Sequence, residues 1–150
     1  MGPVELRTLG SDDVDGLLAA EGLFDQPPRP DWARKFLETD DHHIVIAYLD
    51  GEPVGFVSGV ETTHPDKGTE MFLYELGVDE DHRGQGIGRN MVEELARLAA
   101  SRGCYGMWVA TEPDNAAALG TYRSAGSDDG ETFVILSWQF AAADTDPARI

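Results

Sequence analysis

The chain has 150 residues, 41% of them hydrophobic, and its 11 Lys plus Arg face 28 Asp plus Glu, giving a formal net charge of −17 at pH 7. This length suits one compact domain with a real core. The acidity excludes non-specific binding of nucleic acid or an anionic membrane surface, because both require a positive field. A polycationic small molecule is compatible with the charge, and so is an acidic surface that only promotes solubility.

The cysteine content favours a reducing compartment, and the apolar runs predict neither export nor a membrane span. Cys104 is the single cysteine and cannot form an internal disulfide. The N-terminal segment lacks the basic and apolar regions of a signal peptide, and no segment approaches ~18 consecutive apolar residues. We therefore expect a cytoplasmic protein that does not enter a membrane.

The first 40 residues predict one strand and two helices. Val4–Leu9 alternates apolar and polar residues, and Ser11 offers an N-cap for a helix that runs to about Glu21. Residues 22–31 contain three prolines and predict an irregular loop, of a kind that often borders a binding cleft. A short helix should follow over about Trp32–Glu38.

A hairpin and a central strand come next. The β-rich runs His43–Leu49 and Pro53–Val60 flank an Asp50-Gly51 turn signal, which predicts two antiparallel strands. Thr62–Thr69 is polar and predicts a loop. Glu70–Val78 is an almost continuous apolar run of strand length, as expected in the middle of a sheet.

The second half begins with a glycine-rich turn, RGQGIG at Arg83–Gly88, followed by apolar positions at helical spacing up to an Arg102-Gly103 stop signal. A right-handed crossover should then place the strand Cys104–Ala110 parallel to the central strand. The remaining predicted elements are a helix over about Asn115–Ser124, a last strand Thr132–Phe140 and a flexible tail, 141–150.

The glycine-rich turn has the chemistry of an anion site. Exposed N–H groups at a helix start, approached by residues without Cβ, suit a phosphate, and Arg83 and Arg89 add positive charge. A dinucleotide fingerprint would need glycine at position 89, and the Gly-Lys-Ser/Thr ending of a P-loop is absent. The alternative is that the glycines only permit tight strand-to-helix packing.

Two motifs carry a family resemblance. The first is R-x-x-G-x-G from Arg83 to Gly88; the second is N-x-x-A-x-x-x-Y-x-x-x-G from Asn115 to Gly126. Together they resemble the GNAT N-acetyltransferase family. The segments EMFLYELGVDEDHRGQGI and YRSAG are more narrowly similar to aminoglycoside 3-N-acetyltransferases, although Glu75 stands where Asp is more usual and Gly120-Thr121 replaces a bulkier pair.

The resemblance implies one α/β domain over residues 1–140, with a mixed, mostly antiparallel sheet, a splayed parallel strand pair and flanking helices. It also implies acetyl-CoA as cosubstrate, a β-bulge at Gly77 where the strands part, and a Val78 N–H that polarises the thioester carbonyl. The cofactor-binding residues it implies are Leu76, Gly77, Val78, Arg83, Gly84, Gln85, Gly86, Ile87, Gly88, Arg89 and Asn115.

Two residues are candidates for proton transfer. Glu75 is the one charge inside an apolar run, and burial would raise its pKa toward that of a useful base for the attacking amine. Tyr122 shares a helical face with Asn115 and could protonate the departing thiolate. The alternatives are that Glu75 faces solvent or an arginine, and that Tyr122 is a core tyrosine.

Other polar residues are weaker candidates. Acidic side chains that could bind further ammonium groups of the substrate, if they are not simply solvated, are Asp25, Glu70, Glu75, Glu112 and Asp114. No pair of histidines has the i, i+4 ligand spacing and Cys104 has no CxxC partner, so we expect no metal. A nucleophilic role for Cys104 is not required, because the amine can attack the thioester directly.

These observations lead to ranked functional hypotheses. The first is acetyl-CoA-dependent acetylation of an aminoglycoside, at its 3-amino group. The second keeps the reaction but makes the acceptor a polyamine, an amino acid or a protein N-terminus. The third is a non-catalytic acyl-CoA-binding module, which Glu75 and Tyr122 disfavour. The last predicted strand, with Trp138 and Phe140, could pair across a homodimer.

Overall fold

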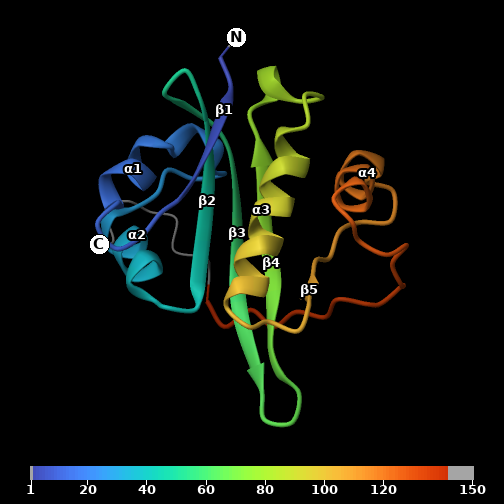
Figure 1. Ribbon diagram of the computed structural model, residues 1–150. Coiled ribbons are helices and arrows are strands. Elements are labelled where there is room, and N and C mark those ends of the chain that lie inside the picture. Colours follow the sequence, from blue (N-terminus) through green and yellow to red (C-terminus); the bar gives the residue numbers. More distant parts are fainter. Residues whose placement is uncertain (1, 142–150) are drawn as a thin grey trace.

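The computed structural model of the protein describes residues 2–141. One five-stranded sheet runs through the molecule in the order β1-β2-β3-β4-β5 (Figure 1). Its first four strands are antiparallel, whereas β5 is parallel to β4. This mixed sheet confirms the expected fold class. The strands are β1 Val4–Thr8, β2 His42–Leu49, β3 Glu52–His64, β4 Gly68–Val78 and β5 Met107–Trp108.

Helices cover both faces of the sheet (Figure 1). They are α1 Val14–Ala19, α2 Pro30–Glu38, α3 Ile87–Ser101 and α4 Ala116–Ser124, with short 3-10 turns η1 Glu21–Leu23 and η2 Glu80–His82. None of the helices within residues 2–141 has the length and apolarity of a membrane span. The first helix begins later than expected, because Asp13 rather than Ser11 is its N-cap and the Asp13 carboxylate accepts the Gly10 N–H at 2.7 Å.

Strand β2 shows why two separate cores form. Val45 and Ala47 face α3 and join a cluster with Met91 and Leu95, all fully buried. Ile44 and Ile46 of β2 point the opposite way, into a smaller cluster with residues of α1 and α2. Both sets are apolar because β2 is covered on both faces, and successive side chains of a strand alternate between the faces.

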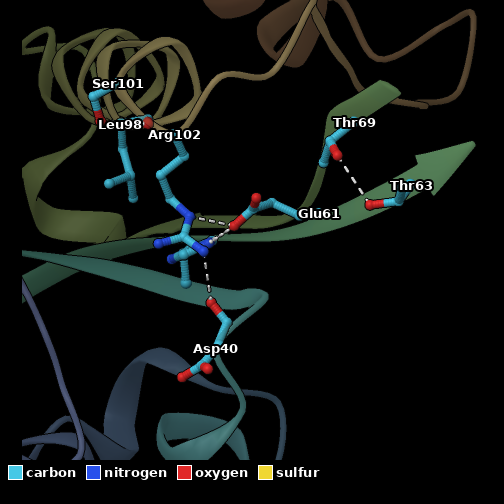
Figure 2. A network of polar contacts seen from close by, with 8 residues as sticks. Asp40, Glu61, Thr63, Thr69, Leu98, Ser101 and Arg102 are labelled. Atoms are coloured by element: carbon cyan, nitrogen blue, oxygen red, sulfur yellow. Dashed lines mark hydrogen bonds and ion pairs between the residues drawn. The ribbon is translucent and has the colours of Figure 1, made fainter. Parts of the chain in front are cut away.

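The β3–β4 hairpin is longer than predicted. Thr62–Thr69 is not a loop: the ladder continues to the pair His64↔Gly68, and only residues 65–67 lie outside it. Thr63 and Thr69 face each other, and their hydroxyls are hydrogen-bonded at 2.9 Å (Figure 2). Cross-strand pairing of β-branched threonines explains why this polar stretch extends the strands.

A buried carboxylate ties α3 to the sheet. Glu61 of β3 accepts a hydrogen bond from the guanidinium of Arg102, at the end of α3, and Arg102 also donates to the Asp40 carbonyl (Figure 2). Nε2 of His43 donates a second hydrogen bond to Glu61 at 2.6 Å. Burial alone would raise the pKa of Glu61, but the hydrogen bonds from His43 and Arg102 outweigh it and hold the pKa below its ordinary value. This contact attaches the C-terminal end of α3 to β3, at the opposite end of the helix from the glycine-rich turn.

The C-terminal part departs from the sequence prediction. Strand β5 is shorter than Cys104–Ala110, because only Met107 and Trp108 pair with β4. The predicted strand Thr132–Phe140 is wrong: these residues form no strand, and their large apolar side chains are exposed. An edge as short as β5 offers them few ladder partners. Of the expected tail, residues 142–150 lie outside the described residues.

Candidate active site

A one-residue irregularity in β4 decides which way the candidate base points. Ser58 of β3 pairs with Glu75, and the next pair joins Gly59 to Leu73, so Tyr74 is an extra residue in β4. The bulge predicted at Gly77 is therefore wrong, since Gly77 pairs regularly with Phe56. Hydrophobic patterning could not locate the bulge, because Tyr74 is compatible with either arrangement.

The extra residue reverses the facing of everything after it. Met71 and Leu73 belong to the core under α3, and without a bulge Glu75 would follow them there. Instead Leu76 packs against that core, while Glu75 turns to the opposite face, toward α1 and α2. A carboxylate inside an apolar run is thus kept out of the main core.

Glu75 opens into a cavity of about 180 Å³ between the sheet and α1–α2, hereafter the acceptor-side cavity. The apolar walls and the Asp25 carboxylate nearby raise the pKa of Glu75 above its ordinary value. Both causes disfavour the charged form. The residues that line the cavity are Leu17, Phe24, Gln26, Pro28, Arg29, Trp32, Ala33, Phe36, Ile44, Phe56, Ser58 and Glu75.

A larger groove of about 850 Å³, hereafter the cofactor groove, lies across the end of β4, the start of α3 and α4. All of the expected cofactor residues except Gln85 line it, as does Tyr122. They come from three separate parts of the chain. The fold therefore brings together in one groove residues that the sequence motifs predicted as a group.

The start of α3, at one end of the cofactor groove, has the backbone geometry expected of an anion site. Gly84 and Gly86 have φ values of +76° and +82°, a region that glycine adopts without strain, and Gly86 is the N-cap without a capping side chain among the described residues. The first helical N–H groups lack intrahelical partners and carry the positive end of the helix dipole. Arg83 is held beside them, its Nε donating to the Val78 carbonyl at 3.1 Å.

The remaining glycine and arginine of this turn have additional structural roles. A Cβ on Gly88 would lie 3.3 Å from Cγ2 of Thr121, so Gly88 allows α3 and α4 to approach closely. The tight-packing interpretation thus applies to this position. Arg89 donates to Glu93 at 2.7 Å, one helical turn further on.

Asn115 and Tyr122 are placed by α4. Asn115 is the N-cap of that helix, and its Oδ1 accepts the Ala118 N–H at 3.1 Å. Two turns later, Tyr122 lies between the cofactor groove and a second cavity of about 520 Å³ under α4. Burial raises the pKa of the Tyr122 hydroxyl, so it stays protonated over the neutral range and can donate.

Strands β4 and β5 separate before the candidate base is reached. Their ladder ends at the pair Phe72↔Trp108, so within residues 2–141 β4 has no parallel neighbour from Leu73 onward. This is the splayed pair that the family resemblance implies. Glu75 and Tyr122 do not share a cavity: one lines the acceptor-side cavity and the other the cofactor groove.

The expected substrate-binding carboxylates are not brought together. Asp25 lies near Glu75, whose pKa it raises. Glu70 lies at the far end of β4, where it accepts a hydrogen bond from His64 at 3.0 Å. Glu112 and Asp114 are exposed in the loop before α4. Among residues 2–141 no cluster of His, Cys, Asp or Glu is arranged to hold a metal ion.

Sequence reasoning missed most of the acceptor-side cavity. Ser58, Phe24 and Trp32 were not singled out, because a serine in a strand and aromatic residues near a proline-rich loop carry no distinctive motif. The loop over residues 22–31 was expected to border a cleft, and four of its residues line the cavity: Phe24, Gln26, Pro28 and Arg29. Only the topology reveals that they meet Glu75.

Comparisons with known proteins agree with this architecture. The profile of the Acetyltransferase (GNAT) family matches residues 12–126. A thialysine N-epsilon-acetyltransferase from Bos taurus is 29% identical over 63% of this chain and 60% of its own length. An L-2,4-diaminobutyric acid acetyltransferase from Streptomyces coelicolor is 32% identical over 62% of this chain and 52% of its own. The chain thus matches little more than half the length of these two relatives.

Solved structures share the fold. An aminoglycoside acetyltransferase from an uncultured soil metagenomic sample superposes with a TM-score of 0.84 at 19% identity, covering 92% of this chain and 97% of the other. Aminoglycoside N-acetyltransferase AAC(6')-Iy in complex with CoA gives a TM-score of 0.74 at 20% identity, covering 93% and 97%. At these identities the likeness concerns the fold alone.

Proposed function

Because the chain belongs to the acetyltransferase (GNAT) family, whose profile matches residues 12–126, we propose that it transfers the acetyl group of acetyl-CoA to an amino group of a small molecule. The observation that carries the proposal is the position of Glu75. It lies beyond the point where β4 and β5 separate, with the cofactor groove on one side of β4 and the acceptor-side cavity on the other.

The cofactor groove fits a molecule with a pyrophosphate and an amide-containing arm. The free N–H groups at the start of α3, the unhindered Gly84 and Gly86, and the Arg83 guanidinium would hold the pyrophosphate. The unpaired edge of Leu76–Val78 would hydrogen-bond the arm as an added strand. Bound there, acetyl-CoA would supply an activated thioester, whose carbonyl the Val78 N–H would polarise.

Glu75 and Tyr122 would then handle the two protons of the reaction. An amine must lose a proton as it attacks, and Glu75, with its raised pKa, would accept that proton on the acceptor side. The thiolate leaves on the other side of β4, where the Tyr122 hydroxyl would protonate it. Attack forms the C–N bond of a tetrahedral intermediate, and its collapse breaks the C–S bond, so one proton leaves the nitrogen and another reaches the sulfur. Two separately placed groups suit these two proton transfers.

Within this proposal, the 3-amino group of an aminoglycoside is the first candidate acceptor. The net charge of −17 supports it, because an acidic surface attracts a polycation. A polyamine, an amino acid or a protein N-terminus is the second, supported by sequence relatives described as acetyltransferases of L-2,4-diaminobutyric acid and thialysine. With an aminoglycoside, the reaction would confer antibiotic resistance in the cytoplasm, where acetyl-CoA is available.

One assay tests the reaction and the acceptor together. CoA thiol release is followed with acetyl-CoA and a panel of gentamicin, spermidine, diaminobutyrate and an N-terminal peptide, at low and at high salt. We expect turnover of gentamicin with a kcat/KM that falls as salt screens the acidic surface. Turnover of other amines alone would remove the aminoglycoside. If acetyl-CoA binds but no amine of the panel causes CoA thiol release, the non-catalytic acyl-CoA-binding module would be favoured.

We also propose that the chain forms a homodimer through residues 132–140. This segment exposes Phe133, Val134, Ile135, Leu136, Trp138 and Phe140, each at least half accessible. Its three aromatic rings can each bury about 150–250 Å², so two copies approach the ~1,600 Å² of a standard interface. The outer edge of β5, the last strand of the described sheet, offers a place for such a segment to pair.

A further inference from the structure

The acceptor-side cavity contains a buried hydroxyl whose hydrogen-bonding capacity is unused. Ser58 is only 4% exposed, and its Oγ has no hydrogen-bond partner within residues 2–141. A buried hydroxyl left unpaired destabilises the folded state, because it loses its hydrogen bonds to water and gains none. Such groups are few in folded proteins, and each calls for a specific explanation.

The position of Ser58 suggests that explanation. Ser58 and Glu75 are direct partners across the β3–β4 ladder and line the same cavity. Side chains of such partners lie about 4.5–5.5 Å apart at Cβ. A nitrogen between them could donate one hydrogen to the Ser58 hydroxyl oxygen and another to the Glu75 carboxylate.

The rest of the cavity suits an apolar carbon skeleton rather than a second charged group. Its walls are mainly apolar, with the rings of Phe24, Phe36 and Phe56 among them. The cationic Arg29, 8% exposed and hydrogen-bonded to Asp31 at 3.2 Å, also lines the cavity and opposes a second ammonium group there. At about 180 Å³ the cavity is slightly larger than one known to hold benzene, ~150 Å³.

We propose that this cavity binds the carbon skeleton beside the reacting nitrogen, taking one ring or an unsubstituted ring edge of a primary amine, while Ser58 and Glu75 hold the nitrogen. The inference rests on the proposed acetyl transfer and specifies which part of the acceptor enters. Further charged groups of a polycationic acceptor would stay outside, toward the acidic surface. Ser58 is thus an acceptor-binding residue that no sequence motif marks.

A direct test is binding of cyclohexylamine to the full chain, followed by NMR chemical-shift titration, which does not depend on turnover. Ser58→Ala should weaken binding about tenfold or more, because a hydrogen bond to a charged group is lost. Its thermal stability should be unchanged or higher, since the unpaired hydroxyl is removed. The matched control is Ser101→Ala. The Ser101 hydroxyl donates to the Leu98 carbonyl at the C-terminal end of α3, outside the acceptor-side cavity, so this variant should bind cyclohexylamine as the wild type does.

Two further comparisons test the apolar walls. Ala33, 4% exposed in the wall, becomes a larger side chain in Ala33→Leu, which should abolish binding of cyclohexylamine but keep that of ethylamine. In the wild type, 2-aminocyclohexanol should bind at least threefold more weakly than cyclohexylamine, because its hydroxyl loses hydration. Wild-type affinity in Ser58→Ala, or equal affinity for the two ring amines, would overturn the proposal.

The outcome separates this inference from the proposed function. If cyclohexylamine binds as described but no amine is acetylated, the subsite stands and acetyl transfer fails. If gentamicin or another amine is acetylated with the same KM by wild type and Ser58→Ala, acetyl transfer stands and the assignment of Ser58 is overturned.

Discussion

Gly77 of β4 packs directly on the ring of Phe56: a methyl group at residue 77 would lie 2.9 Å from Cε1 of Phe56. The contact places Gly77 on the α1–α2 face, since Phe56 belongs to the core on that side. Glu75, two residues earlier, shares that face. The close fit therefore helps to hold β4 in the register that points Glu75 into the acceptor-side cavity.

Replacing Glu75 with glutamine should remove the proposed base. We expect Glu75→Gln to lower kcat about 10²-fold or more while acetyl-CoA still binds, because general-base catalysis contributes on that order. Steady-state kinetics and a binding titration check this. In the wild type, kcat/KM should rise with pH through the raised pKa of Glu75, and the variant should lose that rise.

We expect the same substitution to leave the stability of the folded protein unchanged or to increase it, although it lowers activity. The pKa of Glu75 is higher in the folded protein than its ordinary value, so the folded state binds the proton more tightly. This group's contribution to stability therefore falls as pH rises between the two values. Glu75→Gln removes that loss and should unfold at the same temperature as wild type or higher at pH 7. A clear drop would mean that Glu75 has a structural role.

Tyr122→Phe removes only a hydroxyl and tests the proposed acid. We expect kcat to fall about 10²-fold, with acetyl-CoA affinity changed little because the ring still fills its place under α4. Stopped assays of CoA release and direct binding measurements separate the two effects. An unchanged kcat would mean that Tyr122 is the core tyrosine considered at the outset.

A pair of glycine variants tests the cofactor groove. Gly86 and Gly103 lie at opposite ends of α3, with φ values of +82° and +84°, and neither has atoms within 4 Å of a built Cβ. Alanine at either position should cost a similar ~1–2 kcal/mol of backbone strain. Only Gly86→Ala should weaken acetyl-CoA binding. Equal affinity in the two variants would contradict a pyrophosphate site at the start of α3.

The Glu61 network should make the fold sensitive to acid. The pKa of Glu61 is held below its ordinary value, so its contribution to stability is present above that value and is lost as pH falls through the lowered one. Glu61→Gln should destabilise the protein by about 1–3 kcal/mol at pH 7. It should also flatten the acid limb of a thermal-stability profile. The solvated pair Arg7–Glu5 offers a control, as Glu5→Gln should change little.

The proposed homodimer depends on an apolar segment. Ile135 is 69% exposed, and Ile135→Glu should convert a dimer to a monomer in light scattering, because a charge would be buried in the interface. Ile135→Leu keeps the apolar surface and should remain dimeric. A monomeric wild type at all concentrations would remove the dimer from the proposal.

The sequence was most informative where a residue type has one physical use. The Asp50-Gly51 turn is confirmed by positive φ at both residues, and the helix after the glycine-rich turn begins at Ile87, within the predicted segment. The predicted strand Thr132–Phe140 failed because β-propensity says nothing about whether a partner edge is available. The bulge was misplaced because it depends on pairing with β3 rather than on β4 alone.

The site shows the same division between local and non-local information. The cofactor residues cluster in sequence and were found together, since one turn and one helix supply most of them. The residues that line the acceptor-side cavity come from α1, α2, β2, β3, β4 and the segment before α2. No spacing rule connects Ser58 to Trp32, so only the folded chain shows that they line the same cavity.

The two separate cores have a consequence for how this protein could change over time. The cluster beneath α3 supports the strand and helix that form the cofactor groove, whereas the smaller cluster beneath α1 and α2 forms much of the acceptor-side cavity. Substitutions in the second can alter which amine is accepted while the first continues to hold the fold. Mutational tolerance and drift in specificity should therefore concentrate on the α1–α2 face.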